Sequence, residues 1–543
     1  MYHCGLGHNG GMTNLTRHVA IVSLLALGAF AIEAAPTSCD ALAKLNLPNT
    51  TIKTAEAVPA GTFTPPGNPA IPNLPAFCRV AGMIKPSADS DIEFEVWMPA
   101  SGWNSKFEGI GNGGYAGAIG YGAMGAAVAH GYATAATDTG HHAGATDASW
   151  ALGHPEKVTD FGYRAIHETA EKAKAIIHGF YGEGPKGSYF SSCSDGGREA
   201  LMEAQRFPGD YDGIVAGAPA YNWTHLLSTA LYDLTALLNG PANYIPAGKL
   251  PLIEAANLDA CDALDGVKDG VIDDPTMCHP NYSKLLCTGA ENDKCLTAAQ
   301  ISTLEKIYGG LKDVKGQQIF PGYSPGGEPG MNGWGGWITG ASREKSLQYA
   351  FGTNFFGNMV YSDAKWDYHT FNPERDMKVA DDSVARKLNA TSPDLKKFKD
   401  RGGKLIMYHG WSDAAIPPQA TVDYYKNVVS KMGAKDTATF VRLFMVPGMQ
   451  HCGGGPGPNV FGQAVVTGGD PMHDVDAAIQ AWVEQGRAPE QIIATRYKGM
   501  SPASGVERTR PLCRYPEVAK YKGSGSTDDA ANFSCVDRGV AAK

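Results

Sequence analysis

The sequence predicts an α/β protein in which a mostly parallel sheet is built from two separated parts of the chain. Short strand patterns alternate with helical patterns from residue 92 to residue 220, and the same alternation returns from residue 399 onward. Strand-helix-strand units with short connections are typical of a parallel sheet covered by helices on both faces. Between residues 221 and 398 the alternation stops, so we expect one sheet with a large insertion that covers it as a lid.

The first part of the predicted core follows a proline-rich stretch at residues 39–80, which reads as irregular. Residues 92–98 alternate apolar and polar side chains, as in a strand with one buried face. Apolar residues at helical spacing occupy residues 158–181, and a Gly-Gly turn leads directly into a helix at 198–206. The other strands of this part are expected at residues 106–110, 131–136, 186–192 and 212–216.

The second part of the core lies after the insertion, with strands expected at 404–408 and 439–446 and helices at 419–432 and 475–485. The insertion itself holds four closely spaced cysteines and the run MNGWGGWITG, neither of which suits a regular sheet. A length of 543 residues leaves room for such an added domain. The expected organisation is a signal peptide at 1–34, the first core part at 35–220, the lid domain at 221–398 and the second core part at 399–543.

The N-terminus and the cysteines both indicate an oxidising compartment. Arg17 and His18 precede an apolar run at residues 19–32, and the AFA triplet at 29–31 is typical of a secretory cleavage site. Eleven cysteines without a CxxC motif favour disulfides over metal binding, and an even number remains after the signal peptide is removed. We therefore expect a secreted or periplasmic protein.

The composition excludes several classes of partner. Hydrophobic residues make up 43% and charged residues 19% of the chain, which is ordinary for a folded globular protein. The net charge is −9 and no basic stripe is present, so a nucleic-acid partner is not expected. No apolar stretch of about 18 residues follows the signal peptide, so no membrane span is expected. A small-molecule substrate remains, and the sequence does not indicate an oligomeric state.

Ser194 is the candidate nucleophile. The segment YFSSCSDGGREALMEAQRFP places it after a strand and before a helix, and Gly196 and Gly197 permit a tight turn of the nucleophile-elbow type. The usual G-x-S-x-G pattern has glycine where this chain has Ser192, so a simple turn serine is the alternative interpretation of this motif.

Asp413 and His451 complete a candidate catalytic triad. In α/β-hydrolases the acid and then the histidine follow strands of the second half of the sheet. Strand KLIMYHGWSD ends near Asp413, and strand TFVRLFMVPGMQHC leads to His451, so all three groups lie at carboxyl ends of strands. His451 is expected to act as the base, and Asp413 to orient it. The second choices for the base, His409, His141 and His142, are more consistent with structural hydrogen bonding.

An oxyanion hole and a disulfide are expected around this triad. The amide of Asp195 and one from the GNGGYAG loop, Gly113 or Gly114, are the expected donors. Cys193 precedes the nucleophile and Cys452 follows the base, so a Ser194/His451 contact brings these two cysteines within bridging distance.

With CSDGG, HC, AGAPA and GWSDAAIPP, the chain resembles the tannase/feruloyl esterase family over nearly its whole mature length. That family includes tannases, feruloyl esterases and the hydrolase of mono(2-hydroxyethyl) terephthalate. The resemblance implies an α/β-hydrolase core with a lid domain that supplies specificity. It also implies disulfides Cys39–Cys78, Cys261–Cys278, Cys287–Cys295 and Cys513–Cys535, in addition to Cys193–Cys452.

The loop CDALDGVKDGVIDDPTMC at residues 261–278 is a candidate calcium site, as in similar family members. Its carboxylates and backbone carbonyls are hard oxygen ligands at EF-hand-like spacing, although the bidentate glutamate of that motif is absent. A solvated acidic turn is the alternative. The expected ligands of a structural Ca²⁺ are Asp262, Asp265 and Asp269 together with the carbonyls of Val267 and Val271.

The sequence therefore predicts a serine esterase that hydrolyses esters of aromatic (hydroxybenzoic or hydroxycinnamic) acids through an acyl-enzyme, without an organic cofactor. Ile416, close after Asp413, is expected to line the acyl pocket, whereas the lid aromatics Trp334, Trp337, Phe355 and Phe356 read mainly as core. The rival interpretations are a serine carboxypeptidase-like peptidase and a noncatalytic binding protein that kept the hydrolase fold. The acyl group and the alcohol of the ester cannot be read from the sequence.

Overall fold

The computed structural model describes residues 37–330, 332–463 and 469–538. The expected signal peptide lies outside these residues. None of the helices among these residues is both long enough and apolar enough to cross a membrane.

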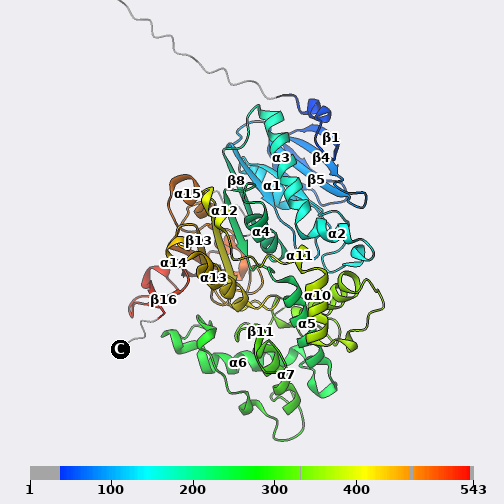
Figure 1. The fold of residues 1–543 in the computed structure, drawn as a ribbon. Helices are drawn as coiled ribbons and strands as arrows, with labels where there is room; N and C mark the ends of the chain where they lie inside the picture. The colour runs from blue at the N-terminus through cyan, green and yellow to red at the C-terminus, as the bar shows by residue number, and fades with distance from the viewer. Residues whose placement is uncertain (1–36, 331, 464–468, 539–543) are drawn as a thin grey trace, which may run out of the picture. The chain divides into compact units, whose positions relative to one another are not determined.

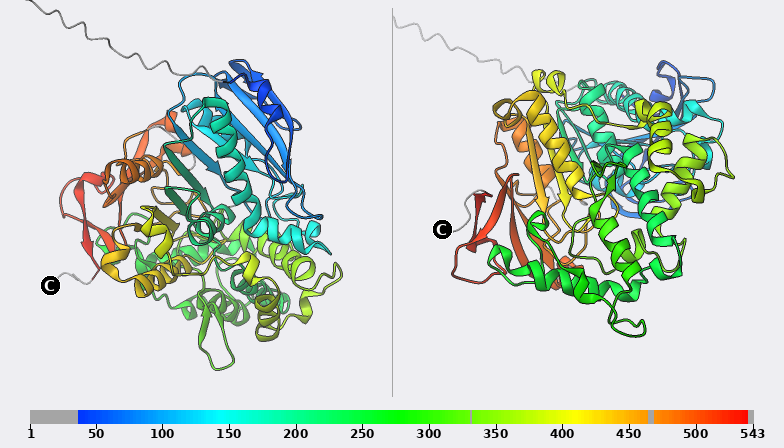
Figure 2. Two further views of the ribbon diagram at one scale, coloured as in Figure 1. Left: turned by 45° about the horizontal axis from the view of Figure 1, so that its top comes forward. Right: turned by 60° about the horizontal axis from the view of Figure 1, so that its bottom comes forward.

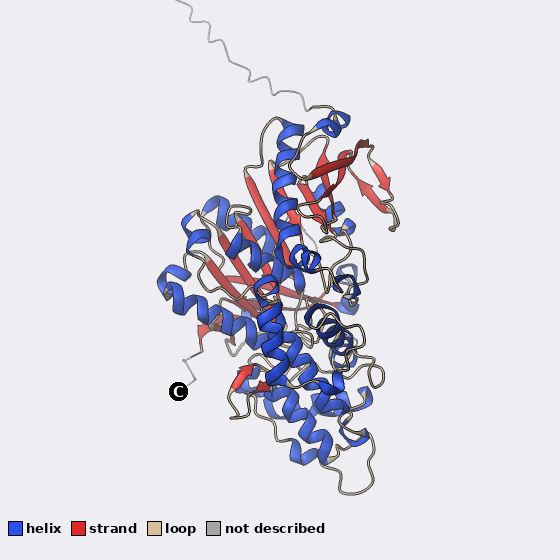
Figure 3. Ribbon diagram, turned by 45° about the vertical axis from the view of Figure 1, so that its right-hand side comes forward, coloured by secondary structure: helices blue, strands red, loops and turns tan. Residues whose placement is uncertain are grey.

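A nine-stranded mixed sheet forms the centre of the core, with helices on both sides (Figures 1 and 3). The six strands from β7 to β13 in spatial order run parallel, and the run GIVAG of β9 is buried at every position because both faces are covered. Across the sheet the strands are β1 (Thr50–Val58), β4 (Phe77–Ile84), β5 (Ile92–Pro99), β7 (Ala133–Thr137), β6 (Lys106–Ile110), β8 (Gly187–Cys193), β9 (Gly213–Gly217), β12 (Lys404–Gly410) and β13 (Val441–Val446).

The expectation that residues 39–80 are irregular is wrong. This stretch contributes the antiparallel edge of the sheet, where β4 pairs with β5 in one continuous register from Phe77↔Pro99 to Ile84↔Ile92. Most of its prolines lie in the connections, and they obscured the strands, whose stability comes from pairing with a later segment. A short hairpin, β2 (Gly61–Phe63) with β3 (Ile71–Leu74), also belongs to this stretch.

Side chains alternate between the two faces of the parallel strands and thereby recruit different helices. In β12, Leu405 and Met407 share a core cluster with the helices α3 (Ala165–Tyr181), α4 (Asp195–Arg206) and α13 (Pro418–Met432). Ile406 and Tyr408 point to the other face and pack with α15 (Val475–Gln485). The predicted helix at 158–181 is observed as α2, a π-helical turn at Asp160–Arg164, and α3. The helices around the sheet are α1 (Tyr121–Ala129), α2 (Pro155–Thr159), α3 (Ala165–Tyr181), α4 (Asp195–Arg206), α13 (Pro418–Met432), α14 (Ala434–Thr437) and α15 (Val475–Gln485).

The insertion is the segment between β9 and β12, drawn mainly in green in Figure 1. β9 and β12 pair directly, with Lys404 opposite Gly213, so the two core parts close one sheet. The insertion is mostly helical and belongs to the same compact unit as the core. Its elements are α5 (Trp223–Leu238), α6 (Leu250–Cys261), α7 (Ala298–Gly309), β10 (Leu311–Lys312), β11 (Gln318–Phe320), α8 (Trp334–Trp337), α9 (Leu347–Asn354), α10 (Pro373–Ser383), α11 (Ala385–Leu388) and α12 (Lys396–Asp400).

Two hairpins that the sequence analysis did not anticipate follow α15, and the last of them is red in Figure 2. They join the core beside β13, where the amide of Tyr515 donates to the carbonyl of Leu443 over 2.7 Å. Their strands are β14 (Gln491–Tyr497), β15 (Val506–Cys513), β16 (Glu517–Tyr521) and β17 (Phe533–Asp537).

Candidate active site

Ser194 occupies the sharp turn between β8 and α4. Its backbone is in a rarely populated region, with φ of 69° and ψ of −122°. The two following glycines are required by space, because a Cβ at Gly196 would lie 1.9 Å from the Ser192 Oγ, and one at Gly197 would lie 2.2 Å from the Gly217 carbonyl oxygen. This is the strand-turn-helix context of a nucleophile elbow.

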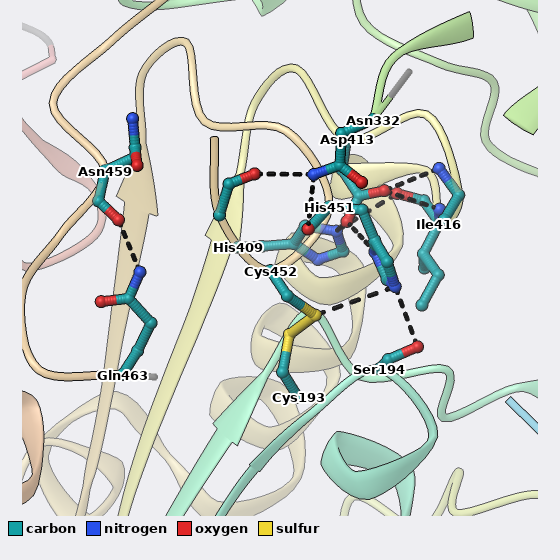
Figure 4. The surroundings of a disulfide bond; sticks show 12 residues. Cys193, Ser194, Asn332, His409, Asp413, Ile416, His451, Cys452, Asn459 and Gln463 are labelled. Carbon is teal, nitrogen blue, oxygen red and sulfur yellow. Dashed lines mark hydrogen bonds and ion pairs between the residues drawn. A yellow bond between two sulfur atoms is a disulfide. The ribbon is translucent and has the colours of Figure 1, made fainter. Parts of the chain in front are cut away.

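His451 links the nucleophile to the acid (Figure 4). Its Nε2 lies 2.9 Å from the Ser194 Oγ, and its Nδ1 lies 2.8 Å from the Asp413 Oδ2. The loop after β13 carries His451, and the loop after β12 carries Asp413. The arrangement allows the imidazole to take the serine proton while the carboxylate holds the ring and stabilises its charged form.

Asp413 is buried and held by several donors. Its Oδ1 accepts the amides of Ala415 at 2.7 Å and Ile416 at 2.9 Å, and its Oδ2 lies 3.1 Å from the His409 Nε2. Burial alone would raise the pKa of Asp413, but the charge and hydrogen bonds of His451 and His409 outweigh it, so the pKa lies well below its usual range. Asp413 therefore stays ionised while His451 accepts and returns the serine proton.

The three second-choice histidines have other positions. His409 is buried behind Asp413, with its Nδ1 2.7 Å from the Thr421 Oγ1, so it positions the acid. His141 bonds to the carbonyl of Tyr115 at 2.7 Å, and burial lowers its pKa to about 4. His142 is exposed and lies beside the carboxylates of Glu93 on β5 and of Asp138, which directly follows β7.

A disulfide joins the elbow to the histidine loop (Figure 4). Cys193 and Cys452 are bonded with a Cα–Cα distance of 6.0 Å, although 259 residues separate them in the chain. The pairings that the family resemblance implied are also present in the structure. They are Cys39–Cys78, Cys261–Cys278, Cys287–Cys295 and Cys513–Cys535.

The expected oxyanion donors lie around the nucleophile. Asp195 is the first residue of α4, so its amide has no acceptor within the helix. Gly114 lines the same cavity as the nucleophile, whereas Gly113 is not among the residues that line it. Glu199, which the sequence analysis did not single out, anchors this loop by accepting the Asn112 amide at 2.8 Å. Gly114 is therefore the better placed of the two glycines.

Polar side chains tie the insertion to the catalytic base. The Asn332 amide donates to the carbonyls of His451 at 3.1 Å and Gly453 at 2.8 Å, and Gln450 donates to carbonyls of the insertion. The ring of Trp337 packs edge-on against His451, with centroids 4.9 Å apart. Sequence reasoning missed these contacts because no local pattern relates the insertion to the histidine loop.

A cavity opens beside Ser194, between the core and the insertion. Ile416 lines it, as expected, and so does Trp337. The side chains of Trp334, Phe355 and Phe356 are buried in the hydrophobic interior and are not among the lining residues. Apart from the nucleophile, the lining is almost entirely apolar, and it comprises Gly114, Ala220, Trp223, Leu226, Leu227, Ala230, Trp337, Gln348, Phe351, Ala415 and Ile416.

The acidic loop at 261–278 is closed by its disulfide and packs against β15. Asp262 accepts the amides of Asp269 and Gly270 at 3.1 Å, and Asp265 accepts the amide of Val267 at 2.9 Å. The structure adds two features to this loop. Arg508 and Arg510 pair with Asp269, and a further carboxylate, Asp273, lies beside Asp265, where burial and then this neighbour raise its pKa well above its usual range.

We expect kcat/KM for an ester substrate to fall as the pH is lowered, with the slope of a single proton. His451 accepts the serine proton only when it is neutral, and the lowered pKa of Asp413 keeps this acid charged throughout. A pH-rate profile with a neutral ester between pH 4 and 9 tests this. A flat profile, or an acid limb with the slope of two protons, would contradict the assigned roles.

The comparisons with known proteins agree over most of the chain. The sequence profile described as "Tannase and feruloyl esterase" matches residues 78–536. An uncharacterized esterase from Xanthomonas campestris is 44% identical over 96% of this chain and 95% of its own length. A probable feruloyl esterase B-2 from Aspergillus terreus is 33% identical over 95% of this chain and 99% of its own.

Solved structures share the fold. Feruloyl esterase B from Aspergillus oryzae is 32% identical and superposes with a TM-score of 0.85, covering 93% of this chain and all (100%) of that one. The tannin acyl hydrolase from Aspergillus niger, 24% identical, has a TM-score of 0.74 with 92% and 95% covered, which shows the same fold.

Proposed function

The chain belongs to the tannase and feruloyl esterase family, and we propose that it is a serine esterase that hydrolyses esters of aromatic acids through an acyl-enzyme on Ser194. One observation carries the proposal: a Ser194–His451–Asp413 hydrogen-bond relay opens onto an apolar cavity walled by aromatic side chains. Aromatic and aliphatic walls suit a flat apolar acyl group.

The geometry supports two acyl transfers. His451 takes the Ser194 proton as the Oγ attacks the ester carbonyl carbon, and the amides of Asp195 and Gly114 are the expected donors to the negative charge that develops on the carbonyl oxygen. The same imidazole then gives its proton to the leaving alkoxide, which departs as the alcohol. Water, deprotonated by His451, then attacks the acyl carbon. The imidazolium returns this proton to the Ser194 Oγ as the bond to the acyl group breaks, and the free acid is released.

The rival interpretation as a carboxypeptidase-like enzyme requires a group that recognises a free carboxylate. Among the described residues, neither a lysine nor an arginine lines the cavity, so an ester substrate is favoured. Five disulfides among the described residues support folding in an oxidising compartment, that is, a secreted or periplasmic location.

A substrate screen tests the function. Methyl gallate, methyl ferulate, chlorogenate and mono(2-hydroxyethyl) terephthalate cover the acyl groups, with an aliphatic ester of similar size as the comparison. We expect hydrolysis of at least one aromatic ester, and mass spectrometry of a rapidly quenched reaction is expected to find its acyl group on the peptide that contains Ser194. Turnover of the aliphatic ester alone would refute the aromatic specificity.

We also propose that the acidic loop holds a structural calcium ion. Asp262, Asp265 and Asp269 stand within eight residues, with the carbonyls of Val267 and Val271 between and after them, and oxygen donors of this kind suit a hard cation. Burial raises the pKa of Asp265 and of its neighbour Asp273, and a cation beside them would favour their charged forms. The ion would support the insertion and the β15 contact, without a part in the chemistry.

Removal of calcium is expected to lower the melting temperature by several degrees, because an ion that binds only the folded state stabilises it by about 2.7 kcal/mol at a hundredfold excess over its Kd. Thermal unfolding with EDTA, and then with added calcium, measures this shift, and Asp262→Asn is expected to melt lower and to lose the calcium response. Elemental analysis without calcium, together with melting that is unchanged by EDTA, would end the proposal and leave the triad untouched.

A further inference from the structure

Three side chains where β5 and β7 pair bring one possible metal-ligand atom each to a common point. They are Glu93 of β5, Asp138, which directly follows β7, and His142 of the next loop. The His142 Nε2 lies 3.3 Å from the Glu93 Oε2 and 3.7 Å from the Asp138 Oδ2, and all three atoms lie within 4.8 Å of one another. None of the three is among the residues that line the cavity beside Ser194.

The spacing of these atoms matches the spacing of ligands around a tetrahedral metal ion. Zinc lies about 2.0 to 2.2 Å from imidazole nitrogen and carboxylate oxygen atoms, so two ligands of a tetrahedral site are about 3.3 to 3.6 Å apart. The two distances from the His142 Nε2 correspond to two edges of such a tetrahedron. An imidazole in the ligand set suits zinc better than calcium, which prefers oxygen ligands.

Asp138 distinguishes this group from a surface ion pair. Its side chain is only 2% exposed, and its Oδ1 accepts the amides of Glu93 at 2.9 Å and Gly140 at 2.8 Å. Its Oδ2, the atom on the side of His142, has no hydrogen-bond partner among the described residues. Burial raises the pKa of Asp138 to about 8, although these two amides lower it, and nearby carboxylates raise it further. A cation at the common point would satisfy the unpaired oxygen and favour its charged form.

The other two ligands are also available to an ion. Lys53 pairs with the Glu93 Oε1 at 2.6 Å, so the Glu93 Oε2 remains for a metal. The side chain of His142 is 71% exposed, so an ion can reach its Nε2 from solvent. The group therefore combines one buried ligand with an open approach.

The segment at 138–145 also supports the loop that carries Gly114. The Gly117 amide donates to the Asp138 carbonyl at 3.2 Å. A Cβ on Gly114 would lie only 2.3 Å from the Ala145 carbonyl oxygen, so the two stretches of backbone are in close contact. An ion that joins this segment to β5 would therefore hold the chain on which the Gly114 loop rests.

We propose that Glu93, Asp138 and His142 bind a Zn²⁺ ion, which ties the segment at 138–145 to β5 and so steadies the loop that carries Gly114. The ion takes the Glu93 Oε2, the unpaired Asp138 Oδ2 and the His142 Nε2, with water in the remaining position, and the proton of Asp138 leaves to solvent. Its role is structural, without a step at Ser194, so the inference does not depend on the esterase function.

Calorimetric titration with Zn²⁺ tests this on protein purified without a histidine tag, with calcium in excess so that the acidic loop does not take up zinc. We expect one tightly bound ion per chain. His142→Gln and Asp138→Asn are each expected to weaken binding by more than about 100-fold, since loss of a group that only orients a ligand already costs about 10- to 100-fold. Asp138→Asn keeps the oxygen that accepts two amides, and His142 is exposed, so both variants are expected to fold.

The matched control is His369→Gln, because His369 is 67% exposed and bonds to a single carboxylate, Asp367, at 2.6 Å. It is expected to bind zinc as the unmodified protein does. Hydrogen exchange measured by mass spectrometry is expected to slow in the segment at 138–145 when zinc is added to the unmodified protein and to this control, but not to His142→Gln. Equal zinc affinity in the unmodified protein and in His142→Gln, or exchange in this segment that zinc does not slow, would overturn the inference.

Discussion

Ser194→Ala is expected to lower kcat for an aromatic ester by on the order of 10³-fold or more while the protein stays folded. The Ser194 Oγ, 2.9 Å from the His451 Nε2, is the atom that forms the acyl-enzyme, and no nearby group replaces it. Activity that remains would reflect only the cavity and the oxyanion donors. Single-turnover kinetics and mass spectrometry of the trapped intermediate measure the effect, and circular dichroism checks the fold.

Ser192→Ala is the matched control, because Ser192 lies on the same strand end but its Oγ is packed near Gly111 and Gly196. It is expected to change kcat less than tenfold. Near-normal turnover by Ser194→Ala, or an equal loss in both variants, would remove Ser194 from the role of nucleophile.

The double variant Cys193→Ser with Cys452→Ser is expected to lose activity by on the order of 10²-fold. This loss is larger than the fraction of unfolded protein accounts for. The bridge holds the ends of β8 and of the His451 loop together, and a displacement of about 1 Å between reacting groups costs about this factor. A cross-link over 259 residues also restricts the unfolded chain, so unfolding is expected to become easier by about 4 kcal/mol.

Cys287→Ser with Cys295→Ser is the control for this prediction, since its bridge closes only eight residues of the insertion. It is expected to retain most activity and to lose less stability. The measurements are kcat under conditions in which both variants are folded, and denaturant unfolding curves. Full activity in a folded variant without the Cys193–Cys452 bridge would show that the disulfide is structural only.

The parallel part of the fold was predictable because its signals are local. Strands such as β9 and β12 are short apolar runs between helical patterns, and a sheet covered on both faces requires such runs. The antiparallel edge was not predictable, because β4 is stabilised by pairing with β5, and β1 by pairing with β4, rather than by their own sequence patterns. The hairpins after α15 were missed because β14 and β15, and likewise β16 and β17, are stabilised by pairing with each other, and the chain between the two hairpins bonds to β13.

The candidate site likewise has residues that could be predicted from the sequence and residues that could not. Ser194, Asp413 and His451 follow strand ends in a fixed chain order, so their meeting could be inferred from the sequence, and adjacent cysteines reinforced it. Asn332 and Glu199 could not be inferred, because each acts through a contact between segments far apart in the chain. Asp273 belongs to the acidic loop at residues 261–278, but only the structure shows that it is buried beside Asp265.

The chain leaves the sheet at β9 and returns at β12, its direct neighbour, so the core closes whatever lies between them. An insertion of another length or sequence can therefore be exchanged at these two points, as in a chimera, without a change in strand order. The exchange also has a requirement that the sheet does not impose. The incoming segment must again present an amide to the carbonyls of His451 and Gly453, as Asn332 does, because the base is held from the insertion side as well as from its own strand. An exchanged insertion can thus alter the substrate range while the core keeps the catalytic groups, provided that the contact made by Asn332 is kept.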